Sequence, residues 1–131
     1  MNNISDIKNE NRDAIGIYVH IPFCVQKCLY CDFNSYAGAE KRRDEYIRAL
    51  LGEIRATAHR PGVGGVRADS VYIGGGTPTT LDPQYINTIL RELKDRFDIA
   101  DDAEITIECN PKTAEKADFE KLLRAGVNRL S

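Results

Sequence analysis

The sequence contains no tryptophan and one methionine, and only 8% of its 131 residues are aromatic. It also lacks an excess of positive charge, because 18 Lys and Arg are set against 20 Asp and Glu, for a net charge of −2. Nucleic-acid-binding domains gather basic residues to neutralise phosphates, so the composition argues against a nucleic-acid partner. No apolar run approaches the roughly 20 residues of a membrane-spanning helix, and no membrane span is expected.

The beginning of the sequence lacks the apolar stretch that secretory signals carry. Residues 1–12 are mostly Asn, Asp, Lys and Glu, and residues 1–16 are interpreted as a polar N-terminal segment. We therefore expect a cytoplasmic protein, in whose compartment cysteines stay reduced. The four cysteines then indicate metal or redox chemistry in preference to disulfides.

Strand and helix patterns alternate from residue 17 onward. Short apolar runs predict strands at residues 17–21, 70–73, 104–109 and 127–131. Apolar residues spaced along one helical face predict helices at residues 40–59, 83–97 and 114–125, and residues 22–39 are expected to form a loop. The apolar residues are Tyr46, Ile47, Leu50, Leu51 and Ile54 in the first helix, Ile86, Ile89, Leu90, Leu93 and Phe97 in the second, and Phe119, Leu122 and Leu123 in the third. Because strands alternate with helices, the fold class is α/β, with a parallel sheet and right-handed crossovers.

The length of 131 residues limits how many strand–helix units the sequence can contain. A closed (β/α) barrel usually takes 200 residues or more. We therefore interpret residues 17–131 as the N-terminal portion of a partial barrel with parallel strands, truncated as a fourth strand begins. A complete small α/β sandwich is the alternative that the length allows.

Residue types at the helix ends predict where two helices begin and one ends. Asp82 is expected to cap the second helix, with Pro83 at its first position, where the missing N–H costs nothing. Thr113 is expected to cap the third helix, and Gly126 suits its end.

The alternation along the first strand separates its two faces. Ile17, Val19 and Ile21 are expected to face the helices, and Tyr18 and His20 to face the opposite side.

The alternation along the third strand bears on one of the four cysteines. Cys109 shares a face with Ile105 and Ile107, which indicates a buried, inert thiol, while a role as a fourth metal ligand stays open.

Three cysteines follow the carboxyl end of the first strand, the edge where parallel α/β folds bind ligands. Cys24, Cys28 and Cys31 have the spacing Cys-x3-Cys-x2-Cys, and thiolates prefer zinc or an iron–sulfur cluster. His20 could complete a zinc site, but the second cysteine pair of typical zinc modules is missing. Three thiolates on an iron–sulfur cluster would leave one iron open, as in a reactive site.

The sequence around these cysteines carries a family resemblance. Five motifs occur in order: Tyr18-Val19-His20-Ile21-Pro22-Phe23-Cys24, Cys31-Asp32-Phe33, Gly74-Gly75-Gly76-Thr77-Pro78-Thr79, Ile107-Glu108-Cys109-Asn110-Pro111 and Gly126-Val127-Asn128-Arg129-Leu130-Ser131. Together they resemble the oxygen-independent coproporphyrinogen III oxidase branch of the radical S-adenosylmethionine (SAM) superfamily.

The resemblance implies a cofactor for the cysteine motif. In this superfamily, residues matching Cys24, Cys28 and Cys31 hold a 4Fe-4S cluster, and the amino and carboxylate groups of SAM bind its open iron. The reduced cluster gives one electron to the sulfonium of SAM, and the carbon–sulfur bond breaks to yield a 5′-deoxyadenosyl radical. The protein positions the cofactors and excludes water.

Further positions match family residues that contact SAM. Tyr18 matches a contact near the cluster, and Tyr30 an aromatic position beside the adenine. The resemblance places the amino end of SAM beside Gly75, Gly76 and Thr77.

Glu108 matches the glutamate that binds the ribose hydroxyls of SAM. Judged from its residue type, Glu108 could also form a structural ion pair with an arginine.

Two departures separate the sequence from the oxidases. The oxidases carry a further cysteine where this sequence has Phe33, and a longer arm than the 16 residues before the first strand. The Cys31-Asp32-Phe33 form resembles the HemW group of haem chaperones, which bind haem and deliver it to acceptor proteins. This resemblance implies haem, a haem acceptor protein and a flavodoxin- or ferredoxin-like one-electron donor. The alternatives are an oxidase that makes protoporphyrinogen IX and a zinc-stabilised module, and no catalytic residue is assigned.

Overall fold

The computed structural model describes residues 13–24, 36–37 and 42–131. Cys28, Tyr30, Cys31 and Phe33 lie outside the described residues, so the predictions made for them stay predictions. The described elements are β1 (Ile15–Ile21), β2 (Phe23–Cys24), β3 (Tyr36–Ala37), α1 (Arg43–Ala58), β4 (Arg67–Gly75), a short 3-10 helix (Pro78–Thr80), α2 (Pro83–Arg96), β5 (Asp98–Ile107), α3 (Lys116–Ala125) and β6 (Arg129–Leu130).

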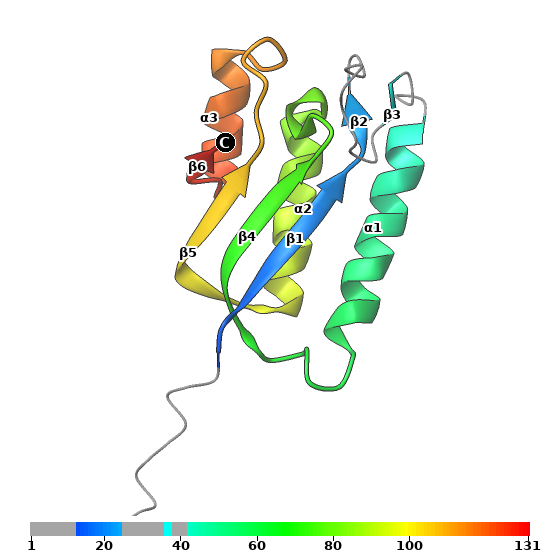
Figure 1. Ribbon diagram of the computed structural model, residues 1–131, viewed down its shortest axis with the longest axis vertical. Coiled ribbons are helices and arrows are strands. Elements are labelled where there is room, and N and C mark those ends of the chain that lie inside the picture. The colour runs from blue at the N-terminus through cyan, green and yellow to red at the C-terminus, as the bar shows by residue number, and fades with distance from the viewer. Residues whose placement is uncertain (1–12, 25–35, 38–41) are drawn as a thin grey trace, which may run out of the picture.

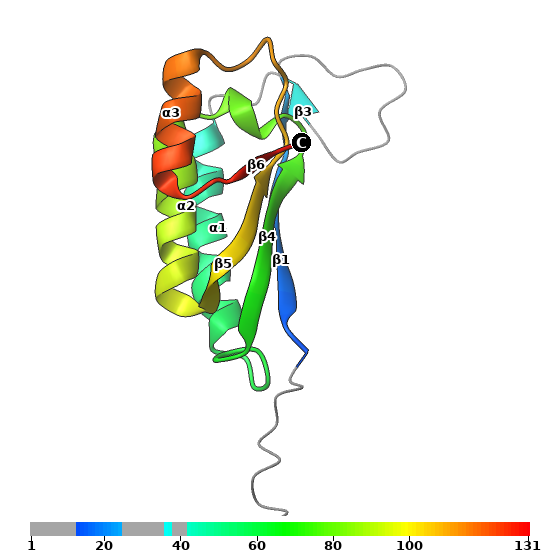
Figure 2. The same cartoon turned by 90° about the vertical axis from the view of Figure 1, so that its left-hand side faces the viewer.

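The main sheet has the strand order β1-β4-β5-β6, and every neighbouring pair in it is parallel. The three helices α1, α2 and α3 all lie on one side of this sheet (Figure 2). All strands of the sheet end at the same edge, which is uppermost in Figure 1. The predicted α/β fold with parallel strands is thereby confirmed.

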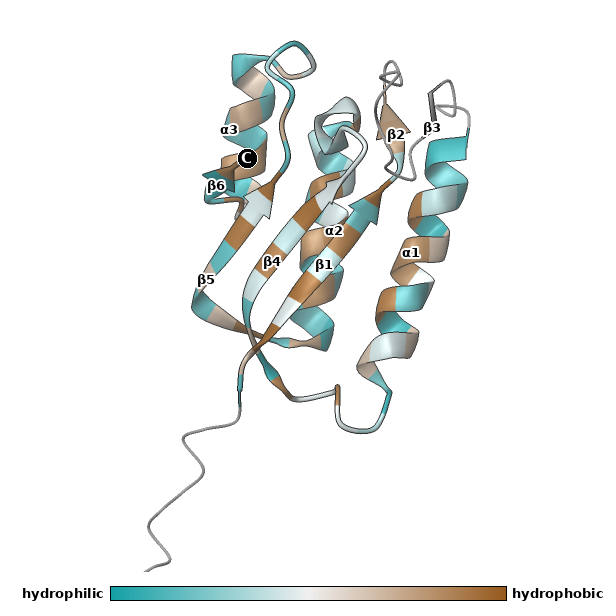
Figure 3. Ribbon diagram, viewed as in Figure 1, coloured by the Kyte–Doolittle hydropathy of each residue, from teal (hydrophilic) through white to brown (hydrophobic). Residues whose placement is uncertain are grey.

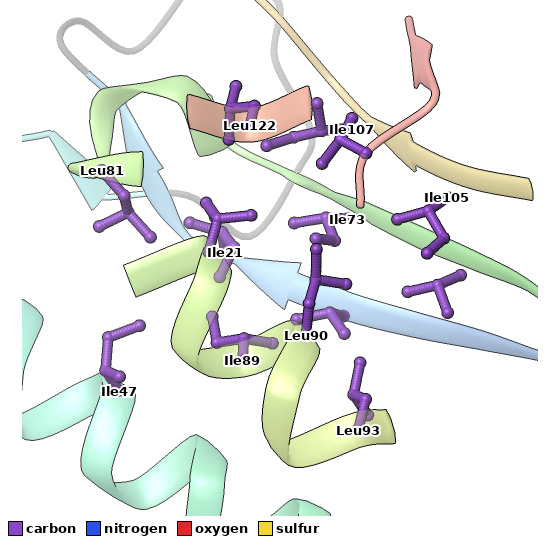
Figure 4. Close-up of a cluster of buried hydrophobic side chains, with 14 of the residues drawn as sticks. Ile21, Ile47, Ile73, Leu81, Ile89, Leu90, Leu93, Ile105, Ile107 and Leu122 are labelled. Atoms are coloured by element: carbon purple, nitrogen blue, oxygen red, sulfur yellow. The ribbon is translucent and has the colours of Figure 1, made fainter. Parts of the chain in front are cut away.

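The core lies between the helices and the face of the sheet that they cover (Figure 4). Val19 and Ile21 of β1 point into it with exposed fractions of 3% and 0%, and Ile17 packs at its margin. The alternation of apolar and polar residues is visible along β1 and β4 in Figure 3. The predicted faces of the first strand are therefore confirmed, because a strand with one covered face places every second side chain in the core.

The helix α2 follows the sequence prediction closely. Asp82 is its N-cap and accepts a hydrogen bond from the backbone N–H of Gln84 at 2.9 Å, while Pro83 occupies the first turn. All of its predicted apolar positions are buried: Ile86, Ile89, Leu90, Leu93 and the following Phe97. At the end of α3, Gly126 has a φ of +113°, the left-handed conformation that glycine adopts most readily.

The predicted start of α3 is wrong. Its N-cap is Glu115, which forms a capping box with Asp118. Thr113 lies two residues before this cap and closes a turn, because its N–H and its hydroxyl both donate to the carbonyl oxygen of Asn110. Of the apolar residues predicted for this helix, Leu122 is buried, whereas Leu123 is 68% exposed.

All four strands of the main sheet differ in extent from the sequence prediction, and β6 (Arg129–Leu130) is shorter than the predicted residues 127–131. β1 begins at Ile15, and β4 (Arg67–Gly75) extends beyond residues 70–73 at both ends. β5 (Asp98–Ile107) starts earlier and ends two residues before Cys109.

The segment predicted as a loop contains the short parallel pair β2 and β3. Phe23 of β2 is buried, and its ring meets that of Tyr46 of α1 edge-on, with centroids 5.4 Å apart. Within the described residues, no helix is long and apolar enough to cross a membrane.

Candidate functional site

The ends of β1, β2, β4 and β5, with the residues that follow them, meet at the carboxyl edge of the main sheet. The backbone N–H of Gly76 donates to the carbonyl oxygen of Ile21 at 2.8 Å, and that of Thr77 donates to the carbonyl oxygen of Phe23 at 2.6 Å. On the other side of β4, the N–H of Glu108 donates to the carbonyl oxygen of Ile73 at 2.9 Å. The glycine motif is therefore fixed between the first cysteine of the loop and the glutamate that follows β5.

Gly76 allows neighbouring segments of the chain to approach its backbone closely, because it has no side chain. A Cβ on Gly76 would lie 2.5 Å from the carbonyl oxygen of Phe23 and 2.8 Å from Sγ of Cys24, both closer than real contacts. Gly75 has a φ of +120°, which L side chains rarely adopt. The Oγ1 of Thr77 lies 3.9 Å from Sγ of Cys24. The motif thus brings the backbone that follows β4 directly against β2, the strand that carries Cys24.

A hollow of about 300 Å³ opens where these segments meet. It is lined by Gly76, Thr77, Glu108, Cys109, Asn110 and Ser131. A larger hollow of about 550 Å³ lies between α2 and α3, lined among others by Lys121 and Arg124, and none of the predicted site residues contributes to it. We place the candidate site at the smaller hollow, because glycine, threonine and glutamate motifs far apart in the sequence converge there.

Glu108 is held by hydrogen bonds within the sheet. Its Oε1 accepts from the hydroxyl of Tyr72 at 2.9 Å, and its Oε2 accepts from the backbone N–H of Gly75 at 3.0 Å. No arginine pairs with Glu108 among the described ion pairs, so the ion-pair interpretation is not supported there. The carboxylate keeps acceptor capacity toward the hollow, since an ionised carboxylate accepts about four hydrogen bonds.

Tyr18 lies on the side of the sheet that faces away from the helices, as expected. Its side chain is 59% exposed, its hydroxyl is 2.9 Å from Nδ1 of His20, and its ring stacks on Tyr72 with centroids 6.2 Å apart. Partial burial, followed by the negative charge of Glu108, raises the pKa of Tyr18 above its ordinary value. The phenol therefore stays protonated at neutral pH and can donate a hydrogen bond.

The two described cysteines differ from the sequence prediction in one respect. Cys24 ends β2, as a half-buried free thiol at the edge of the sheet. Cys109 is also half-buried and lines the hollow, so the predicted core thiol is wrong. The prediction assumed that the strand alternation continues to residue 109, but β5 ends at Ile107. Cys109 follows the strand, and its N–H donates to the carbonyl oxygen of Ser131 at 2.8 Å.

Tyr72 is a site residue that the sequence analysis missed. The register pairs it with Tyr18 on one side and with Thr106 on the other. A signal was available in the alternation of β4, where Val71 and Ile73 are buried and the residue between them must face the other way. The hydrogen bond between Tyr72 and Glu108 depends on how β4 pairs with β5, and the alternation within one strand does not predict it.

Comparison with known proteins places this geometry in a family. Residues 18–131 match the family described as the radical SAM superfamily. Two curated relatives named Heme chaperone HemW are similar: that of Escherichia coli is 44% identical over 119 residues, which are 89% of this chain and 31% of the relative. That of Mycobacterium tuberculosis (strain H37Rv) is 37% identical over 119 residues, 88% of this chain and 30% of the relative. The chain thus spans about a third of the length of these relatives.

A solved structure shares the fold. It is that of the coproporphyrinogen III oxidase HemN from Escherichia coli, a radical SAM enzyme. The TM-score is 0.79 at 34% identity, and the match covers 89% of this chain and 27% of that one. These matches confirm the sequence resemblance, and they agree with the α/β fold class that the alternation of strands and helices predicted.

Proposed function

The chain belongs to the radical SAM superfamily, and on that premise we propose that it serves as a haem chaperone of the HemW type. The observation that carries the proposal is the 44% identity to the Escherichia coli Heme chaperone HemW over 89% of this chain. The absence of a further cysteine at Phe33 agrees with this choice. Since the chain spans 31% of that relative, haem binding and transfer are proposed for the whole protein.

The proposed cofactors are those of the superfamily. We propose that Cys24, Cys28 and Cys31 hold a 4Fe-4S cluster, and that SAM lies in the hollow beside Gly75, Gly76 and Thr77. Support comes from the Cys24 thiol, which stands at the rim of the glycine motif because Gly76 has no Cβ to displace it.

The remaining proposed contacts involve the ribose, the adenine and the part of SAM near the cluster. The Glu108 carboxylate retains acceptor sites that suit ribose hydroxyls. Tyr18 and Tyr30 complete the proposed SAM contacts, and the cluster would supply one-electron chemistry once reduced.

The proposed partners follow from this function. Haem is the cargo, an acceptor protein receives it, and a flavodoxin- or ferredoxin-like protein supplies single electrons. We propose the cytoplasm as the compartment, in agreement with the reduced cysteines that cluster assembly needs.

A second candidate is coproporphyrinogen oxidation to protoporphyrinogen IX. It is favoured by the likeness to the solved HemN structure, which is a likeness of fold at 34% identity. The two candidates differ in what the protein does with a tetrapyrrole: a chaperone binds haem and releases it unchanged, whereas the oxidase decarboxylates a porphyrinogen.

One experiment separates the two functions. The full-length protein is reconstituted anaerobically with iron and sulfide, titrated with haem while its Soret absorption is followed, and then incubated with coproporphyrinogen III, SAM and a reductant. We expect saturable haem binding and no protoporphyrinogen IX, with the Escherichia coli oxidase as the positive control for turnover. Formation of protoporphyrinogen IX, or a failure to bind haem, would reject the chaperone assignment.

A further inference from the structure

The carboxylate of Glu108 is oriented by two donors that both come from β4. The Tyr72 hydroxyl holds one oxygen at 2.9 Å, and the Gly75 N–H holds the other at 3.0 Å. With one donor on each oxygen, the carboxylate cannot rotate without losing a hydrogen bond. Each oxygen keeps a further acceptor site, and Glu108 lines the hollow of about 300 Å³. The group is therefore aimed at the hollow with two adjacent acceptors.

Gly74 makes this arrangement possible by having no side chain. A Cβ on Gly74 would lie 2.8 Å from Cε1 of Tyr72 and 2.9 Å from Cδ of Glu108. Gly74 is not among the glycines with a positive φ, so its backbone conformation does not call for glycine. The phenol and the carboxylate thus meet in the space that any larger residue would fill.

The ring of Tyr72 is itself held in place by Tyr18. The two residues are paired in the β1–β4 register, and their rings stack with an interplanar angle of 25°. Because the stack already restrains the ring, little further side-chain entropy is lost when the hydroxyl of Tyr72 binds Glu108, which follows the neighbouring strand β5.

We infer that Tyr72 and Gly74 are positioning residues that present the Glu108 carboxylate to two neighbouring hydroxyls of a bound ligand. The ligand class is an adenosine derivative with an intact ribose diol, and in this respect the inference rests on the proposed function. Tyr72 acts through Glu108 and does not itself touch the ligand. Removing the Tyr72 hydroxyl should therefore weaken the binding of ligands that carry the diol and spare ligands that lack both of its hydroxyls.

The test is an equilibrium binding measurement on the full-length protein with its reconstituted cluster. S-adenosylhomocysteine and its 2′,3′-dideoxy analogue are titrated against the unaltered protein, Tyr72→Phe, Glu108→Gln and the double variant. We expect Tyr72→Phe to weaken the binding of S-adenosylhomocysteine about five- to tenfold, the range of one typical hydrogen bond, and to change the binding of the dideoxy analogue less than about twofold. The double variant should bind no more weakly than Glu108→Gln.

Matched variants exclude a general loss of structure. Tyr85→Phe also removes a phenol that donates to a carboxylate, that of Asp44, but it joins α2 to α1 on the helical side and should leave both affinities unchanged. Gly74→Ala should reproduce the ligand-selective loss of Tyr72→Phe, because its Cβ displaces the carboxylate.

The outcomes distinguish failure of the inference from failure of the proposed function. Equal losses for both ligands in Tyr72→Phe, or no loss for either, overturn the inference and leave the SAM site standing. A further loss in the double variant also overturns it, because Tyr72 would then act independently of Glu108. If the unaltered protein does not bind S-adenosylhomocysteine, the proposed SAM site and the inference fail together.

Discussion

Replacing Gly76 by alanine should separate the glycine motif from the cysteine strand. The added Cβ would lie 2.5 Å from the carbonyl oxygen of Phe23, about 0.9 Å short of the 3.4 Å at which ordinary contact begins. The obstacle is a backbone group that cannot rotate away, so the two segments must move apart. That movement stretches two hydrogen bonds, from Gly76 N–H to Ile21 and from Thr77 N–H to Phe23.

The magnitude follows from these contacts. Two stretched hydrogen bonds cost about 1 kcal/mol each, and crowding in a packed region costs about 1–3 kcal/mol. Because part of the crowding is relieved by the same movement, we expect Gly76→Ala to lower the free energy of unfolding by about 2–4 kcal/mol. Cluster content should fall with it, since the added Cβ would also lie 2.8 Å from Sγ of Cys24.

Gly52→Ala is the matched control for this change. Gly52 is an exposed residue inside α1, and no heavy atom lies within 4 Å of the Cβ that alanine would add. Alanine is the better helix former, so this variant should gain about 0.5–1 kcal/mol. Urea unfolding followed by far-ultraviolet circular dichroism measures both variants. A Gly76→Ala protein within about 0.5 kcal/mol of the unaltered one would refute the steric argument.

Two further predictions concern stability. Leu122→Ala should cost about 2–5 kcal/mol because Leu122 is 3% exposed, whereas Leu123→Ala should stay within about 0.5 kcal/mol because Leu123 is 68% exposed; equal losses in urea unfolding would contradict the observed rotation of α3. Hydrogen bonds from Arg55 and then Arg96 lower the pKa of Glu92 from 4.5 to about 2, so their stabilising effect is complete above pH 4.5 and disappears as the pH falls towards 2. Glu92→Gln should therefore reduce the change in the free energy of unfolding between pH 4.5 and about 2. An unchanged pH dependence would show that the bonds of Glu92 to the two arginines do not contribute to stability.

Local signals in the sequence were sufficient for much of the fold. The buried stripe and the Asp82 cap of α2 depend on residues within a few turns of one another, and both were predicted correctly. The start of α3 was not, because Thr113 and Glu115 are both able to cap, and the choice depends on the turn that Asn110 makes with Thr113. The pattern placed both Leu122 and Leu123 on this helix but did not say which one enters the core. Leu123 is exposed because its neighbour Leu122 faces the core, and consecutive helical residues point about 100° apart.

The site was predicted as motifs, and its internal geometry was not. The family resemblance selected Glu108 and the glycines from their sequence positions. The contact between Tyr72 and Glu108 joins residues 36 positions apart and depends on the register of β4 against β5. The same is true of Cys109, whose exposure depends on β5 ending at Ile107 and not on the local alternation. Long-range register is the information that a single sequence does not carry.

The central claim is that Cys24, Cys28 and Cys31 assemble an iron–sulfur cluster. It is tested most directly by measuring iron, sulfide and zinc in the full-length protein after anaerobic reconstitution, together with Cys24→Ala and Cys109→Ala. We predict iron and sulfide in equal amounts with broad visible absorption for the unaltered protein and for Cys109→Ala, and loss of both elements in Cys24→Ala. Stoichiometric zinc without iron, or a Cys24→Ala protein that retains its cluster, would contradict this account.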